Sequence, residues 1–136
     1  MSKSNTTEND TLNALLRGVD PAWRSNANRY IAYHTADPGE AGSAITNELS
    51  VGGYIRIAVV ASSGFTEASG GSSSNVDALP TVECTSGSET ATHLSIVTTA
   101  SGAGQILYSG ALTTPRLVDA GTILNIAAGS LVISED

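Results

Sequence analysis

Apolar and polar residues alternate along most of the chain after residue 28. In "YIRIAVVA", residues 54–61, one side of the alternation is mainly apolar and consists of Ile55, Ile57, Val59 and Ala61. A period of two with one apolar face is typical of a half-buried strand. Further strands are predicted in "RYIAYHT" (29–35), "SGFTEAS" (63–69), "LPTVECT" (79–85), "ATHLSIVTT" (91–99), "GQILYSGAL" (104–112) and, as two brief strands, "TILNIAAGSLVISED" (122–136).

Turn residues punctuate these segments. Asp37-Pro38-Gly39 ends the first strand, "GGSSSN" at 70–75 is predicted as a loop, and the Gly-containing link at 100–104 predicts a hairpin. No helical pattern separates the strands, which argues against a parallel α/β sheet. We therefore expect an all-β fold, an antiparallel two-sheet sandwich of jelly-roll type with about eight strands.

The first 28 residues carry a different pattern. Residues 1–9 are polar and aperiodic, which predicts a flexible arm. A short helix is expected to begin at Asp10 as N-cap and to end at Gly18. Its apolar residues follow helical spacing: Leu12, Leu15, Leu16 and Val19. Two turns of helix are unstable alone, so this stripe and Trp23 must pack on this domain or on another chain, and the sequence leaves both open. We divide the chain into an N-terminal arm, 1–28, and a β-sandwich domain, 29–136.

Composition narrows the functional classes. The chain has 136 residues, enough for one domain, and its single Phe, single Trp and four Tyr leave the core to aliphatic side chains. We expect such a thin core to gain stability from neighbouring subunits. A net charge of −7 disfavours nucleic acid and anionic membranes as partners.

The remaining global signals concern compartment. Cys84 is the only cysteine, so no internal disulfide is expected. Neither a secretory signal peptide nor a membrane span is recognisable, so we expect synthesis in a reducing cytoplasm.

Two groups of residues are candidates for a metal site or a catalytic site. His34, Asp37, Glu40 and Glu48 are close in sequence, but their spacing matches no zinc or calcium motif. We expect His34 at a strand end and the acids on a solvated loop. Cys84 and His93 could form a thiolate–imidazole pair, but no third group orients the imidazole. We therefore expect a protein that is not an enzyme and has no cofactor or metal.

Tyrosines provide one further alternative. Aromatic rings stack on sugar faces, and alternation predicts that Tyr54 and Tyr108 point outward. A carbohydrate-binding module therefore stays open, although packing explains Tyr30 and Tyr33 equally well.

Several segments resemble a family of small structural proteins of tailed phages. They are "AYHTADPGEAG", "TNELSVGGYIRIAVV", "THLSIVTTASGAGQILYSGAL" and "IAAGSLVISED", and the resemblance runs from about Arg29 to Asp136. Members are capsid cement (decoration) proteins, and similar sequences are often labelled tail-fibre proteins. Residues 1–28 lie outside the resemblance. Phe65 stands where similar sequences often carry Trp, which puts the strand there in doubt.

The resemblance implies a virion protein on the outer capsid surface that bridges major capsid protein subunits. Because an antiparallel sandwich with open edges often pairs, we also expect a dimer or trimer of this chain on the shell. A tail-fibre or tail-associated protein is the nearest alternative. The residues we expect to bind partners are Leu12, Leu15, Leu16 and Trp23 in the arm, with Asp37 and Glu40 at the acidic turn.

Overall fold

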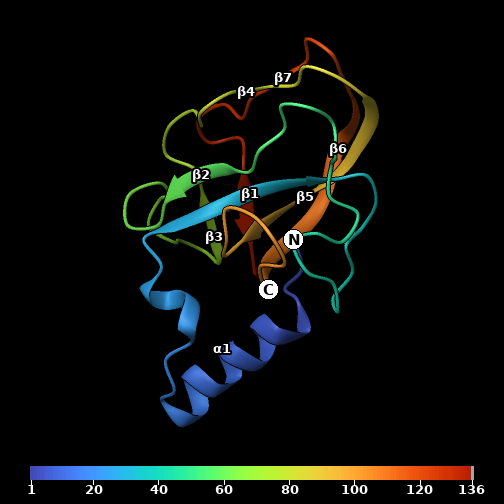
Figure 1. Cartoon of the computed structure of the whole chain (residues 1–136). Helices are drawn as coiled ribbons and strands as arrows, with labels where there is room; N and C mark the ends of the chain where they lie inside the picture. The colour runs from blue at the N-terminus through green and yellow to red at the C-terminus, as the bar shows by residue number, and fades with distance from the viewer. Residues whose placement is uncertain (136) are drawn as a thin grey trace.

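A computed structural model describes residues 1–135 of the chain (Figure 1). Within this range an α-helix and a short 3-10 helix precede eight strands: α1 (Asn5–Arg17), η1 (Ala22–Ser25), β1 (Asn28–His34), β2 (Ile57–Val60), β3 (Ser72–Ser74), β4 (Val82–Glu83), β5 (Ser88–Val97), β6 (Ile106–Asp119), β7 (Ile123–Leu124) and β8 (Val132–Ser134). All strand pairs are antiparallel. The predicted all-β antiparallel sandwich with a short N-terminal helix is confirmed.

The main sheet contains four strands in the order β2-β1-β5-β6. Ile31 on β1 pairs with Ile57 on β2 and with Ile96 on β5. Residues directly opposite in antiparallel strands share a face, so these three buried side chains point to one side of the sheet. β5 and β6 form the predicted hairpin, joined by residues 98–105.

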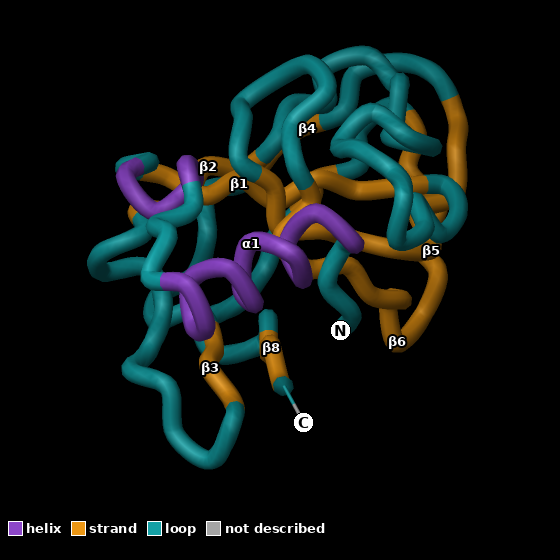
Figure 2. Tube along the Cα trace, turned by 90° about the horizontal axis from the view of Figure 1, so that it is seen from below, coloured by secondary structure: helices purple, strands orange, loops and turns teal. Residues whose placement is uncertain are grey.

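Two short ladders, β3–β8 and β4–β7, form the second layer. Figure 2 shows β3 and β8 side by side, away from β1 and β2. Buried residues of this layer, such as Val82, Leu124 and Ile133, belong to the same apolar cluster as Ile31 and Ile57. The main core therefore lies between the four-stranded sheet and the two ladders.

A second, smaller cluster lies on the opposite side of the sheet. It consists of Ala32, Ala44, Val97 and Ile106. Ala44 belongs to the loop between β1 and β2, and its N–H donates to the Gly104 carbonyl at 2.8 Å. This loop carries Asp37, Glu40 and Glu48, so the packing of Ala44 helps to place those acids.

The helix begins earlier than predicted. Ser4 is the N-cap, because its hydroxyl accepts a hydrogen bond from the Thr7 N–H, and Asp10 lies inside α1. The expected flexible arm is also wrong. Ser2 exchanges two backbone hydrogen bonds with Ser109, of 2.9 and 2.8 Å, and so adds to the edge of β6. The helix ends at Gly18, as predicted, with φ at 65°.

Three strand predictions need correction. "GGSSSN" is not simply a loop, because β3 lies inside it and pairs with β8. "SGFTEAS" contains no strand, only two isolated bridges, Phe65 with Asn75 and Ser69 with Ser72. The strand predicted at 104–112 continues to Asp119 through Pro115. Proline is tolerated there because β6 is an edge strand, where a missing N–H breaks no ladder.

Candidate functional site

Helix α1 contacts the body of the protein through its polar side. The hydroxyls of Ser4 and Thr7 both donate to the Ile106 carbonyl, at 2.6 and 2.7 Å. The Asp10 carboxylate accepts from the Trp23 indole at 3.0 Å and from the Gln105 amide at 2.9 Å. Buried hydrogen bonds, not apolar packing, therefore hold the helix in place.

The apolar side of α1 faces outward. Leu12, Leu15 and Leu16 are 55, 76 and 79 % exposed, and we call these three residues the leucine face. Val19, just beyond the helix, is 49 % exposed. In a surface helix of a globular protein the apolar stripe normally faces the core, and here the exposure of the three leucines shows the reverse orientation. This domain does not cover the stripe, which was one of the two options the sequence left open.

Trp23 does not share the leucine face. It is half-buried and packs against the main core. Its indole N–H bonds to Asp10, and the Arg29 guanidinium lies 5.8 Å from its ring centroid. Trp23 therefore attaches η1 to the inner side of α1.

The acidic turn, with Asp37 and Glu40, lies next to the N-terminal end of α1, whereas the leucine face lies towards its C-terminal end. Asp37 and Glu40 are exposed, as expected, and the Asp37 carboxylate accepts from the Gly39 N–H at 2.8 Å. The Glu40 carbonyl accepts from the N–H of Asn5, the first residue of α1, at 3.0 Å. At a rise of about 1.5 Å per residue, Leu15 lies about 15 Å further along the helix. The residues expected to bind partners therefore occupy three separate places.

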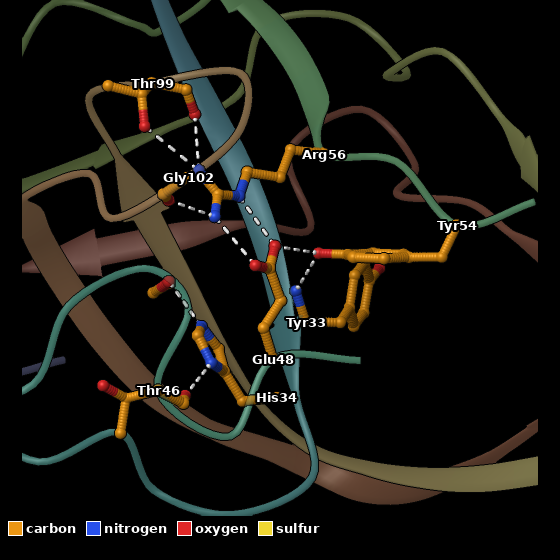
Figure 3. A network of polar contacts seen from close by, with 9 residues as sticks. Tyr33, His34, Thr46, Glu48, Tyr54, Arg56, Thr99 and Gly102 are labelled. Carbon is orange, nitrogen blue, oxygen red and sulfur yellow. Dashed lines mark hydrogen bonds and ion pairs between the residues drawn. The ribbon is translucent and has the colours of Figure 1, made fainter. Parts of the chain in front are cut away.

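His34 ends β1, as predicted, and is fully buried. Its Nδ1 lies 2.8 Å from the Thr46 carbonyl and its Nε2 lies 2.7 Å from the Ser95 hydroxyl (Figure 3). Since a carbonyl only accepts, Nδ1 carries the proton in the neutral ring. Burial lowers the pKa of His34, so the neutral form is favoured.

Glu48 forms a two-pronged ion pair with Arg56, and Figure 3 shows the arrangement. Arg56 Nε and Nη2 donate to the two carboxylate oxygens, both at 2.7 Å. The Arg56 guanidinium also donates to the Thr99 and Gly102 carbonyls. Only 15 % of the Glu48 side chain is exposed, so the expectation of a solvated acid is wrong for this residue.

The Tyr54 hydroxyl completes this network. It donates to Glu48 at 3.0 Å and accepts from the Tyr33 N–H at 3.0 Å, so the predicted outward orientation of Tyr54 is wrong. Burial raises the pKa of the Tyr54 phenol well above its ordinary value. The network joins the β1–β2 loop to the β5–β6 turn. The only sequence signal for this network was Arg56 itself. A charged residue inside the apolar run "YIRIAVVA" needs a buried partner for its charge.

Cys84 and His93 make no hydrogen bond to each other in the described part of the chain. Cys84 is fully buried, and burial raises the pKa of its thiol, which disfavours the thiolate. His93 Nδ1 lies 2.9 Å from the Thr92 hydroxyl. Among residues 1–135, no group of three or more His, Cys, Asp or Glu side chains could hold a metal ion, and no helix is long and apolar enough to cross a membrane.

A cavity of about 320 Å³ lies between the N-terminal segment and the sheet. We call it the N-terminal cavity. Its lining includes the buried residues Ile96, Leu107 and Ile133, the half-buried aromatics Trp23, Phe65 and Tyr108, and the basic residues Lys3 and Arg29. Half of the six aromatic residues of the chain thus line one hollow.

Tyr108 is half-buried and packs against the main core. Its hydroxyl bonds to Glu135, and the Lys3 ammonium lies 5.9 Å from its ring centroid and 2.6 Å from Glu135. The Tyr108 ring therefore lines the cavity and does not project freely into solvent, as a ring that stacks on a sugar would.

Comparison with known proteins gives one family. The sequence model described as "Podophage GP4 fiber I protein gp80" matches residues 2–134. The match includes the N-terminal helix, which the resemblance of the quoted segments did not reach. No curated protein sequence matches the chain.

Proposed function

The chain belongs to the podophage GP4 fiber I protein family of phage structural proteins, and we propose from this premise that it is a non-enzymatic fibre component of the virion. In this role it binds other proteins of the virion and carries out no chemical reaction. The family description, which names a fibre, supports this assignment over other places in the particle.

The observation that carries the proposal is the outward leucine face. Burying a leucine side chain that is now exposed stabilises a complex by roughly 1.5–3 kcal/mol. Single exposed leucines are ordinary, but three on one side of a helix whose other side is bonded to its own domain form a ready contact for a second protein. Residues 5–17 lie inside the family match, so this helix belongs to the shared pattern.

A capsid cement protein is the second candidate, and the resemblance of the four quoted segments favours it. In that role the chain would bind the outer capsid surface and bridge major capsid protein subunits. Many copies with modest contacts would then act through avidity.

Copy number and position separate the two candidates. Quantitative mass spectrometry of purified virions, with gold-labelled antibody to locate the chain, is expected to find few copies at the tail. Many copies over the head would replace the fibre assignment with the cement assignment. Absence of the chain from purified virions would refute both.

The leucine face is tested by the double substitution Leu15→Asp/Leu16→Asp. We expect incorporation into virions to fall at least tenfold while the isolated protein keeps its circular dichroism spectrum and unfolding midpoint. Leu117→Asp, at another exposed leucine, on β6 (57 %), is the control and is expected to be incorporated normally. Normal incorporation of the double variant would show that α1 is not the contact.

A further inference from the structure

Two apolar surfaces of this chain have opposite shapes. The leucine face projects side chains from α1, whereas the N-terminal cavity is a hollow lined mostly by apolar side chains. Leu12, Leu15 and Leu16 follow the i, i+3, i+4 spacing with which an amphipathic helix enters an apolar groove. A cavity of about 320 Å³ is within the size range of pockets that bury a small ligand, so it has room for aliphatic side chains.

The leucine face cannot fill the cavity of its own chain. Thr7 and Thr11, on the inner side of α1, line the cavity. The Thr7 hydroxyl is fixed to the Ile106 carbonyl, so that side of the helix is committed to the body. The three leucines are exposed and do not line the cavity, so an occupant carrying such a face must come from another molecule.

Charge is complementary between the two surfaces. Glu8 is exposed and makes no ion pair with any described residue. It lies four residues before Leu12, at the border of the leucine face, where it also lines a smaller hollow together with Lys3 and Tyr108. The cavity contains Lys3 and Arg29, two of only six basic residues in a chain of net charge −7.

Of the two cations that line the cavity, Arg29 is the one without a carboxylate partner among the described residues. Its guanidinium donates to the carbonyls of Asn26 and Asn28 and lies over Trp23, with no acid within ion-pair distance among residues 1–135. Lys3, by contrast, already pairs with Glu135. A half-buried cation without an acid is stabilised by a carboxylate supplied from outside.

We propose that copies of this chain bind one another head to tail, with the leucine face of one copy seated in the N-terminal cavity of the next and Glu8 directed at Arg29. This names the partner of the leucine face and so rests on the proposed function. The interface is heterologous, because two different surfaces meet, and it extends into a ring or a filament according to the rotation between copies.

The contact is weak between free molecules. A stable interface buries roughly 800 Å² on each partner, more than one short helix face provides. Copies held side by side in a virion have a high effective concentration, which makes such a contact sufficient. Association in solution is therefore expected to depend on concentration.

Complementary defects test the head-to-tail arrangement. Leu15→Asp/Leu16→Asp removes the face, and Ala61→Trp fills the cavity, which Ala61 lines. In sedimentation velocity, the wild-type chain is expected to form larger species as its concentration rises, and each variant alone to stay monomeric. An equimolar mixture of the two variants is expected to stop at the dimer, because it has one intact face and one intact cavity.

Electrostatics provide a second test, which uses a variant that leaves the cavity unfilled. Glu8→Lys changes an exposed residue, so folding is expected to be unaffected, and association should weaken by about fivefold or more because attraction becomes repulsion. Arg29→Gln should weaken association to a similar extent. If Ala61→Trp fails to fold, Arg29→Gln serves in its place as the cavity variant. Leu117→Asp serves as the control with unchanged association.

Four results would overturn the inference. The first is a wild-type chain that stays monomeric up to the solubility limit. The second is an Ala61→Trp chain that associates like the wild type, which would indicate a symmetric helix–helix pair. The third is a variant mixture that does not associate. The fourth is saccharide binding on a glycan array that Ala61→Trp abolishes while self-association is unchanged. The proposed function is tested separately. If the Leu15→Asp/Leu16→Asp variant is not incorporated into virions, the proposed function stands even when one of these four results refutes self-association.

Discussion

Arg56 is buried although it belongs to an apolar alternating segment. Its guanidinium makes five hydrogen bonds, to Glu48, Thr99 and Gly102, so its charge and its donors are satisfied. Alternation predicted Ile55 on the buried side of this segment, but Ile55 is 66 % exposed. The strand begins only at Ile57, because the residues before it follow the polar network and not the pleat.

Removing Arg56 is expected to be costly. Arg56→Leu leaves Glu48 buried without its partner, and breaking such a pair destabilises a fold by about 3–5 kcal/mol. Urea unfolding measures the change. Arg24→Leu is the control, because its pair with Asp20 is exposed and should contribute less than about 1 kcal/mol. Equal losses in both variants would contradict a structural role for the Glu48–Arg56 pair.

His34 predicts a pH dependence of stability. Its pKa in the folded state is lowered by burial, below the value near 6.5 of an unfolded chain. As pH falls through about 6.5, the unfolded state therefore binds a proton first, and the free energy of unfolding decreases until the folded pKa is passed. Unfolding midpoints between pH 8 and 5 measure this. His34→Gln is expected to remove that part of the slope, whereas His93→Gln, at a partly exposed position, should keep it.

At the scale of elements, α1 is the part whose orientation matters most. Its apolar spacing and its end at Gly18 were predictable, because periodicity and a C-terminal glycine are local signals. Its start at Ser4 could not be predicted, because Ser4 and Thr7 are fixed by hydrogen bonds to the Ile106 carbonyl. Ile106 lies 102 residues after Ser4 along the chain. The turn at Asp37 and Glu40 was also predicted, but its contact with Asn5 was not.

The two hydroxyls that hold α1 are expected to control its detachment. Ser4→Ala/Thr7→Ala removes the N-cap and both bonds to Ile106, each worth about 1 kcal/mol. Hydrogen exchange should then become faster in α1 while the β1, β5 and β6 amides keep their protection. Thr6→Ala, at an exposed position, is the matched control. Unchanged exchange in α1 would mean that the hydroxyl bonds do not anchor the helix.

At the scale of the whole molecule, one sheet with two short ladders encloses a core that is almost wholly aliphatic, as the composition predicted. The main sheet has a second, smaller cluster beneath the β1–β2 loop. That neighbouring molecules add stability to this core stays a prediction.

Self-association would make thermal stability depend on concentration. A partner that binds only the folded state raises the unfolding midpoint as its concentration rises. Scanning calorimetry of the wild-type chain is expected to show this rise, and Ala61→Trp is expected to lack it. A midpoint independent of concentration in the wild type would contradict a stabilising contact between copies.

The sequence by itself determined the all-β class, the positions of β1, β4 and the β5–β6 hairpin, and the end of α1, because these depend on residues that are neighbours along the chain. It also indicated that Asp37 and Glu40 are exposed. Only the tertiary structure decided that the polar side of α1 faces inward, that Arg56 meets Glu48, and that three aromatic residues share one cavity. Those outcomes depend on hydrogen bonds and packing between distant segments, and no local pattern records which distant group a side chain will meet.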